Sequence, residues 1–108
     1  MNEYTPDRWV VLELSNDEIN IKKVFAGWYG GYLGSDNWKL SSGIVEVKDT
    51  GDAYEFLNHS GSVYTCYKRS YGMTGLMSDI YSGILEHKEP FNVKVLEEYE
   101  PEKPNASN

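Results

Sequence analysis

Apolar and polar residues alternate along much of the chain, a pattern that predicts β-strands. In residues 8–14 one side carries Val10, Leu12 and Leu14, and the other carries Trp9, Val11 and Glu13. Residues 21–29 continue the alternation, and the turn-forming residues 15–18 separate the two runs. We therefore expect these two segments to form a β-hairpin.

Shorter alternating segments predict the remaining strands. They lie at Trp38–Leu40, Ile44–Val47, Ala53–Asn58, Ser62–Arg69 and Phe91–Leu96. Residues 49–52 have the composition of a turn between two of these strands. Ser60 and Gly61 suggest a second hairpin, which joins 53–58 to 62–69.

One segment has helical periodicity. Met73, Met77, Ile80 and Ile84 are spaced 4, 3 and 4 residues apart, which places them on one face of a helix. Thr74 is a suitable N-cap, and Pro90 is a stop signal. We expect a single helix over about 74–88, packed on the sheet.

These elements predict a mainly β (α+β) fold. We expect a small curved antiparallel sheet of five or six strands, or a partly open barrel, with one face covered by the helix. The 108 residues suffice for one compact core. Residues 1–100 are expected to form a single globular domain, followed by a flexible acidic and polar tail at 101–108.

Charge and composition narrow the classes of partner. A net charge of -7 disfavours nucleic acid, whose phosphates attract basic proteins. No apolar run approaches about 18 residues, so we expect no membrane insertion. The single cysteine, Cys66, allows no internal disulfide and fits a reducing compartment. These features predict a cytoplasmic protein.

Cys66 and His59 are the residues that a catalytic interpretation would use. A two-residue loop at Ser60 and Gly61 pairs Cys66 with residue 55, about 13 Å from His59 at about 3.3 Å per residue. A four-residue loop over 58–61 brings them no closer. The histidine and cysteine spacings also lack the close pairs of a structural zinc site. We therefore predict no catalytic residues, no metal and no cofactor.

The segment 27–34 contains four glycines with aromatic residues between them. A phosphate-binding loop requires a helix after such glycines, whereas here another strand follows. Flat rings beside permissive backbone are instead typical of recognition surfaces. The alternative is that the rings only fill the core. The candidate binding residues are Trp28, Tyr29, Tyr32, Trp38, His59, Lys68 and Arg69.

Three stretches carry a family resemblance: Ala26–Tyr32, Asp36–Ile44 and Ser60–Cys66. In these stretches the chain resembles a group of small bacteriophage and prophage proteins to which no activity is assigned. The resemblance extends over roughly residues 8–72. It implies no catalytic residues, and it favours an accessory protein that binds a component of a bacterial host.

Our leading hypothesis is a non-enzymatic recognition protein that presents the 27–38 segment, and the turn at 59–62, to a host protein. The alternative is a binder of a nucleotide or another metabolite, with rings stacked on the base and Lys68 or Arg69 on the phosphate. A third class is an enzyme with an unrecognised site. Self-association through an aromatic edge strand is also compatible with the sequence.

Overall fold

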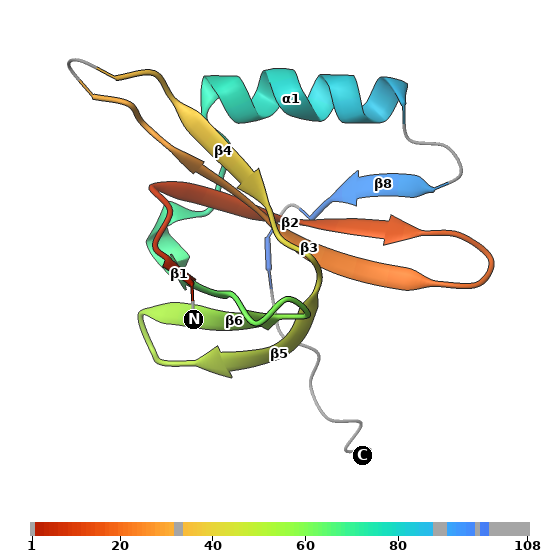
Figure 1. Ribbon diagram of the computed structural model, residues 1–108, viewed down its shortest axis with the longest axis horizontal. Helices are drawn as coiled ribbons and strands as arrows, with labels where there is room; N and C mark the ends of the chain where they lie inside the picture. The colour runs from red at the N-terminus through yellow and green to blue at the C-terminus, as the bar shows by residue number, and fades with distance from the viewer. Residues whose placement is uncertain (1, 32–33, 88–90, 97, 100–108) are drawn as a thin grey trace.

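The computed structural model describes residues 2–31, 34–87, 91–96 and 98–99, which form two four-stranded sheets and one helix. The strands are β1 (Glu3–Tyr4), β2 (Arg8–Ser15), β3 (Asn20–Trp28), β4 (Asn37–Leu40), β5 (Ile44–Asp49), β6 (Ala53–Asn58), β7 (Val63–Tyr67) and β8 (Asn92–Val95). The helix α1 spans Gly75–Glu86, and a short 3-10 helix spans Lys68–Ser70. One sheet has the order β4-β3-β2-β8 and the other β1-β7-β6-β5. Figure 1 shows the arrangement.

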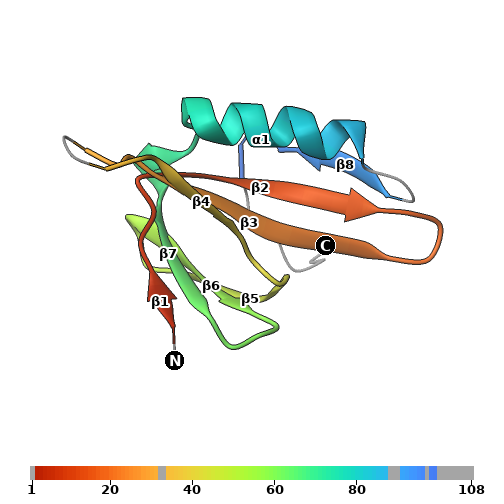
Figure 2. The same cartoon turned by 45° about the horizontal axis from the view of Figure 1, so that its top comes forward.

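The molecule has three layers, with α1 on one face of the β4-β3-β2-β8 sheet and the second sheet against its other face (Figures 1 and 2). The central hairpin of β2 and β3 is therefore buried on both sides. Val10, Leu12 and Phe25 pack with Met77 of α1. Trp9, Val11, Val24 and Ala26 pack against the second sheet. The predicted hairpin is confirmed, with Arg8 opposite Gly27 and Ser15 opposite Asn20.

The turn between β6 and β7 differs from the two-residue loop that the sequence suggested. The N–H of Asn58 donates to the carbonyl of Ser62 at 2.9 Å, and the N–H of Gly61 donates to the carbonyl of Asn58 at 2.8 Å. Residues 59–61 thus form a three-residue loop, which Gly61 closes with a φ of 92°. Glycine populates this left-handed region without steric cost.

The changed loop length shifts the strand register by one residue. Tyr54 now pairs with Cys66 and Phe56 with Tyr64, so these apolar side chains share one face. All four belong to the core cluster that faces β2 and β3. The expected register, which divided them between two faces, was wrong.

The helix begins as the sequence indicates. Thr74 is the N-cap, and its Oγ1 accepts the N–H of Met77 at 3.1 Å. The expected helix extended to residue 88; the described one ends at Glu86, while Pro90 and residue 88 lie outside the described residues.

The mainly β class with one covering helix is confirmed, but the strand arrangement differs in detail. In the described part of the chain the strands form two sheets that do not close into a barrel. The pairing of β1 with β7 is parallel rather than antiparallel, with Tyr4 opposite Tyr64. The polar residues at the start of the chain lack the alternation that would predict this strand. The predicted tail at 101–108 lies outside the described residues.

Candidate functional site

The glycine-rich segment after β3 forms a loop that two carboxylates anchor. Asp7 accepts the backbone N–H of Tyr29 at 2.9 Å, and Asp36 accepts that of Gly30 at 3.0 Å. A Cβ atom at Gly30 would collide with the backbone of Ser35, so the two limbs of the loop approach as closely as glycine permits. The described part of this loop is therefore held by specific contacts.

The predicted ring residues of this segment differ in exposure. Tyr29 is 54% exposed and Trp38 is 40% exposed, which is high for side chains of their size. Trp28 is half-buried, and its Nε1 donates to the carbonyl of Thr5 at 3.0 Å. Tyr32 lies outside the described residues.

An open cleft of about 320 Å³ lies beside β4, and we call it the edge cleft. Its lining residues are Tyr4, Trp28, Asn37, Trp38 and Lys39. The rings of its two tryptophans lie on opposite faces of the sheet. The Trp28 ring packs on the side of the second sheet, and the Trp38 ring packs on Phe25 on the helix side, with ring centroids 5.9 Å apart.

The rings of Tyr4 and Trp28 meet edge to face, with centroids 6.2 Å apart. Lys39 places its Nζ 5.2 Å from the centroid of the Tyr4 ring. The cleft thus combines the rings of Tyr4 and Trp28 with the ammonium group of Lys39, and Asn37 and Trp38 border it.

The backbone of β4 is exposed beside this cleft because β4 is the last strand of its sheet. Ser41, just beyond the strand, donates its N–H to the carbonyl of Val24 at 2.9 Å. Residues that exchange hydrogen bonds alternate along an antiparallel pair. Counting back from Ser41, Lys39 turns its N–H and C=O toward β3. Trp38 and Leu40 turn theirs away from β3, toward the open edge.

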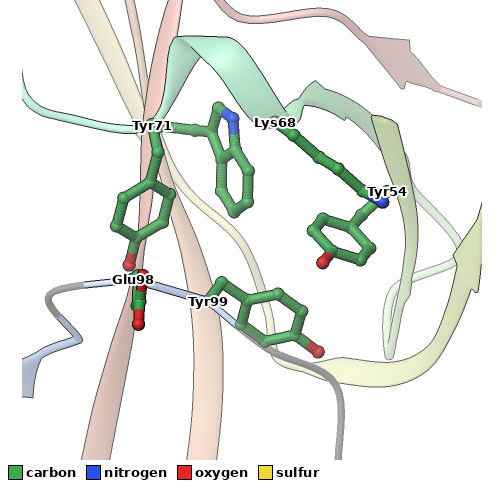
Figure 3. A pocket seen from close by; sticks show the side chains of 6 residues that line it. Tyr54, Lys68, Tyr71, Glu98 and Tyr99 are labelled. Carbon is green, nitrogen blue, oxygen red and sulfur yellow. The ribbon is translucent and has the colours of Figure 1, made fainter. Parts of the chain in front are cut away.

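A second concave region of about 350 Å³ lies over the core between the two sheets, and we call it the ring cleft (Figure 3). Its lining residues are Trp9, Tyr54, Lys68, Tyr71, Glu98 and Tyr99. Trp9 is fully buried and packs edge to face on Tyr71, with centroids 4.7 Å apart. The rings of Tyr54 and Tyr99 also meet edge to face, at 5.1 Å.

Two polar groups of the ring cleft, the indole N–H of Trp9 and the hydroxyl of Tyr71, already have partners within the protein. The indole N–H of Trp9 donates to the carbonyl of Tyr67 at 2.7 Å. The hydroxyl of Tyr71 donates to the carbonyl of Leu96 at 2.6 Å and accepts the N–H of Val11 at 3.3 Å. Burial raises the pKa of Tyr71. These contacts hold the cleft walls together.

The two predicted basic residues are also engaged. Lys68 donates to both carboxylate oxygens of Asp49, at 2.9 and 3.1 Å, and lies 4.8 Å from the centroid of the Tyr54 ring. This pairing lowers the pKa of Asp49 and raises that of Lys68. The guanidinium of Arg69 lies over the Tyr67 ring at 4.8 Å. Neither residue lines the edge cleft.

The structure separates the two residues considered for catalysis. His59 is exposed in the three-residue loop, whereas Cys66 is fully buried inside the core. Burial raises the pKa of the Cys66 thiol well above its usual range, so the reactive thiolate is disfavoured. Burial likewise raises the pKa of Tyr64 to about 12. Within the described residues, no group of three or more His, Cys, Asp or Glu side chains is placed to hold a metal ion.

Of the seven candidate residues, six lie in the described part of the chain, and among these Trp28 and Trp38 both border the edge cleft, while Tyr29 follows Trp28 directly in the chain. Sequence reasoning missed Tyr4 and Lys39, which complete the edge cleft. Tyr4 lies in a polar segment without a strand pattern, and its place depends on a parallel pairing between residues about 60 positions apart. The alternation of 38–40 did carry a signal for Lys39, because it places that side chain opposite Trp38 across the strand.

Comparisons with known proteins give no match, whether with family models, curated proteins or solved structures. In the described part of the chain, no helix has the length and apolar character needed to span a membrane. The interpretation of the site therefore rests on its own residues.

Proposed function

We propose that this protein binds another protein through the surface that joins the edge cleft, Tyr29 and the outer edge of β4. The observation that carries the proposal is the exposure of Trp38, at 40%, on an edge strand whose outer backbone pairs with no other strand among the described residues. Large aromatic side chains supply much of the binding energy of protein interfaces because they bury a large area at small entropic cost.

The shape of this surface favours a protein over a small molecule. The edge cleft, at about 320 Å³, lies at the lower end of the range for small-molecule sites, and it is open to solvent. Tyr29 is exposed in the loop rather than in the wall of the cleft. A ligand that used both features would have to extend along the surface, as a protein segment does.

A bacterial host protein is the partner class that the resemblance to phage and prophage proteins favours. A non-enzymatic role agrees with the placement of Cys66 and His59, which are too differently situated to act together. The protein would act by occupying a surface of its partner.

Affinity capture with matched variants tests this proposal. Trp38→Ala and Tyr29→Ala remove the exposed rings, while Val45→Ala alters an apolar residue on β5, in the other sheet, that is 58% exposed. We expect the wild type and Val45→Ala to retain the same protein from bacterial lysate at equal yield, and Trp38→Ala to lose at least tenfold. Quantitative mass spectrometry provides the readout, after urea titration has shown that each variant is folded. If all variants capture the same proteins equally, this surface is not the binding site.

A specific observation favours a second candidate, a small-ligand binder. The ring cleft combines four aromatic side chains with the ammonium of Lys68 in a concavity of about 350 Å³. Bases stack on such rings, but a phosphate would have to compete with Asp49 for Lys68. A thermal-shift panel of nucleotides tests it, since a ligand at 100 times its dissociation constant adds about 2.7 kcal/mol of stability. A flat response across the panel, with unchanged melting temperatures, would exclude those ligands.

A further inference from the structure

We propose that the partner contributes an extended segment that pairs with β4 as an additional strand. An acidic side chain of that segment contacts Lys39, and an apolar side chain two residues away enters the edge cleft. This inference rests on the proposed function and adds the chemistry of the partner.

The outer backbone of β4 is suited to pairing with an added strand. Trp38 and Leu40 turn their N–H and C=O groups out of the sheet, as the register with β3 and the Ser41 hydrogen bond establish. In the described part of the chain, no strand lies on that side of β4. An extended peptide satisfies such groups with main-chain hydrogen bonds, the mode known as strand addition. Because Trp38 and Leu40 are two residues apart, their hydrogen bonds determine which positions of the peptide face the cleft.

The charge of Lys39 favours an acidic side chain on the added strand. Lys39 has no carboxylate within ion-pair distance in the described part of the chain, and its ammonium group rests over the Tyr4 ring. Lys68 provides the contrast, because Asp49 already binds it. The nearby Asp7 and Asp36 each accept a backbone N–H of the loop instead. An acidic side chain directly opposite Lys39 on an added strand would therefore form an ion pair with it.

Lys39 also argues against a second copy of this chain as the occupant. Antiparallel pairing of two β4 strands uses the free groups of both Trp38 and Leu40 when Trp38 of one copy lies opposite Leu40 of the other. That register places the two Lys39 side chains directly opposite each other, and like charges at opposed positions destabilise a sheet. Lysines on edge strands commonly prevent such self-pairing.

The edge cleft can receive an apolar side chain of the added strand. Side chains of an added strand alternate between its faces, so positions opposite Lys39 and Asn37 both lie on the face of the edge cleft. That face carries the half-buried rings of Tyr4 and Trp28. An apolar side chain opposite Asn37 can therefore rest against these rings while the acidic one reaches Lys39. The predicted motif is an acidic residue, any residue, and then an aromatic or large aliphatic residue, in either chain direction.

Synthetic peptides provide the test. Three ten-residue peptides of alternating Thr and Val differ only at their centre. The first carries Glu-Thr-Phe, and the second carries the charge-reversed Lys-Thr-Phe. The third carries Glu-Phe-Thr, in which the Glu and Phe side chains fall on opposite faces of the strand. Binding to the full chain is measured by NMR titration, and hydrogen exchange of the Trp38 and Leu40 amides is measured with and without peptide. We expect Glu-Thr-Phe to bind at least tenfold more tightly than either control and to slow exchange at both amides.

The variant Lys39→Glu sharpens the test because it reverses the charge at an exposed position. We expect it to prefer Lys-Thr-Phe over Glu-Thr-Phe. Equal binding of the charge-reversed peptides, unchanged exchange at Trp38 and Leu40, or no binding by any peptide would overturn strand addition. A concentration-dependent dimer that protects these amides without peptide would overturn it in favour of a second copy. If Trp38→Ala still loses a captured host protein in any of these cases, the proposed function stands and only its mode is wrong.

Discussion

The ring cleft and the edge cleft are built from the same types of side chain, yet they differ in what those side chains already do. Around the ring cleft, Trp9 is 1% exposed and donates a hydrogen bond to Tyr67, and Tyr71 bridges two backbone groups. At the edge cleft, Trp38 is 40% exposed and belongs to β4, whose outer backbone has no neighbouring strand in the part of the chain that the structure describes. One set of rings closes the core, and the other is left at its margin.

The comparison shows that the number of aromatic residues does not by itself identify a binding surface. What separates the two regions is whether exposure, charge and hydrogen bonds have been satisfied within the fold. Lys68 of the ring cleft is paired with Asp49, whereas Lys39 of the edge cleft has no such carboxylate in the described part of the chain. The two regions should therefore respond differently to chemical probes and to substitution.

The largest expected effect concerns the chemical accessibility of the two regions. Burial raises the pKa of Cys66 and shields its sulfur, so alkylation has to await opening of the core. The double variant Lys39→Cys/Cys66→Ala moves the single thiol to the edge cleft. We expect native Cys66 to react with iodoacetamide at least about 1,000-fold more slowly than the thiol of this variant. Mass spectrometry over time gives both rates, and similar rates would show that the core opens as easily as the edge.

The two tryptophans should differ in their effect on stability. Trp9→Ala removes a buried ring that contacts Tyr54, Phe56 and Tyr71, and should cost about 3–5 kcal/mol. Trp38→Ala removes a partly exposed ring that packs on Phe25, and should cost less, about 1–2 kcal/mol. Urea titrations followed by circular dichroism measure both. Equal losses would mean that Trp38 is a structural residue, and the proposed surface would lose its main support.

The sequence predicted the strands and the helix because their signals are local. Alternation places Val10 and Leu12 on one face of β2, and apolar residues spaced four and three residues apart around Met77 indicate α1. What it did not reveal is that the opposite face of β2 is covered as well. The apolar run of Trp9 and Val11 on that face carried the information, because a strand buried on both sides lacks a polar face.

The site was only partly predictable for a different reason. The hairpin-like pairing of β3 with β4, which sequence spacing indicates, brings Trp28 and Trp38 to the same edge of the sheet on opposite faces. Tyr4 reaches Trp28 through a parallel pairing with β7, and no local pattern encodes a contact over that separation. The error in the β6–β7 register arose similarly from one residue of loop length, which the sequence around Gly61 allows in several forms.

A smaller effect is expected from the hydroxyl of Tyr71. Tyr71→Phe leaves the ring in place but deprives the Leu96 carbonyl and the Val11 N–H of their partner. We expect a loss of about 1–2 kcal/mol in the free energy of unfolding, measured by urea titration. Tyr29→Phe is the control, because Tyr29 is exposed and should show no change. An equal effect of both variants would contradict the assignment of a structural role to the ring cleft alone.

The smallest effect should come from the ion pair of Lys68 and Asp49, since both groups are exposed to solvent. The hydrogen bond from Lys68 lowers the pKa of Asp49, so Lys68→Met should raise that pKa toward its ordinary value. Lys39→Met should leave it unchanged, because Lys39 has no contact with Asp49. NMR titration of the Asp49 carboxyl carbon gives all three values.

The pH dependence of stability follows from the directions in which folding shifts the pKa values of Asp49 and Lys68. A carboxyl whose pKa is lowered by folding stabilises the folded state above its ordinary pKa, and that contribution is lost as the pH falls through the lowered value. Lys68, whose pKa is raised, contributes below its ordinary pKa and loses its effect as the pH rises through the raised value. The melting temperatures of wild type and Lys68→Met should therefore differ slightly at neutral pH and converge in strong acid. A difference that persists in acid would show that Lys68 acts through its packing on the Tyr54 ring rather than through its ion pair with Asp49.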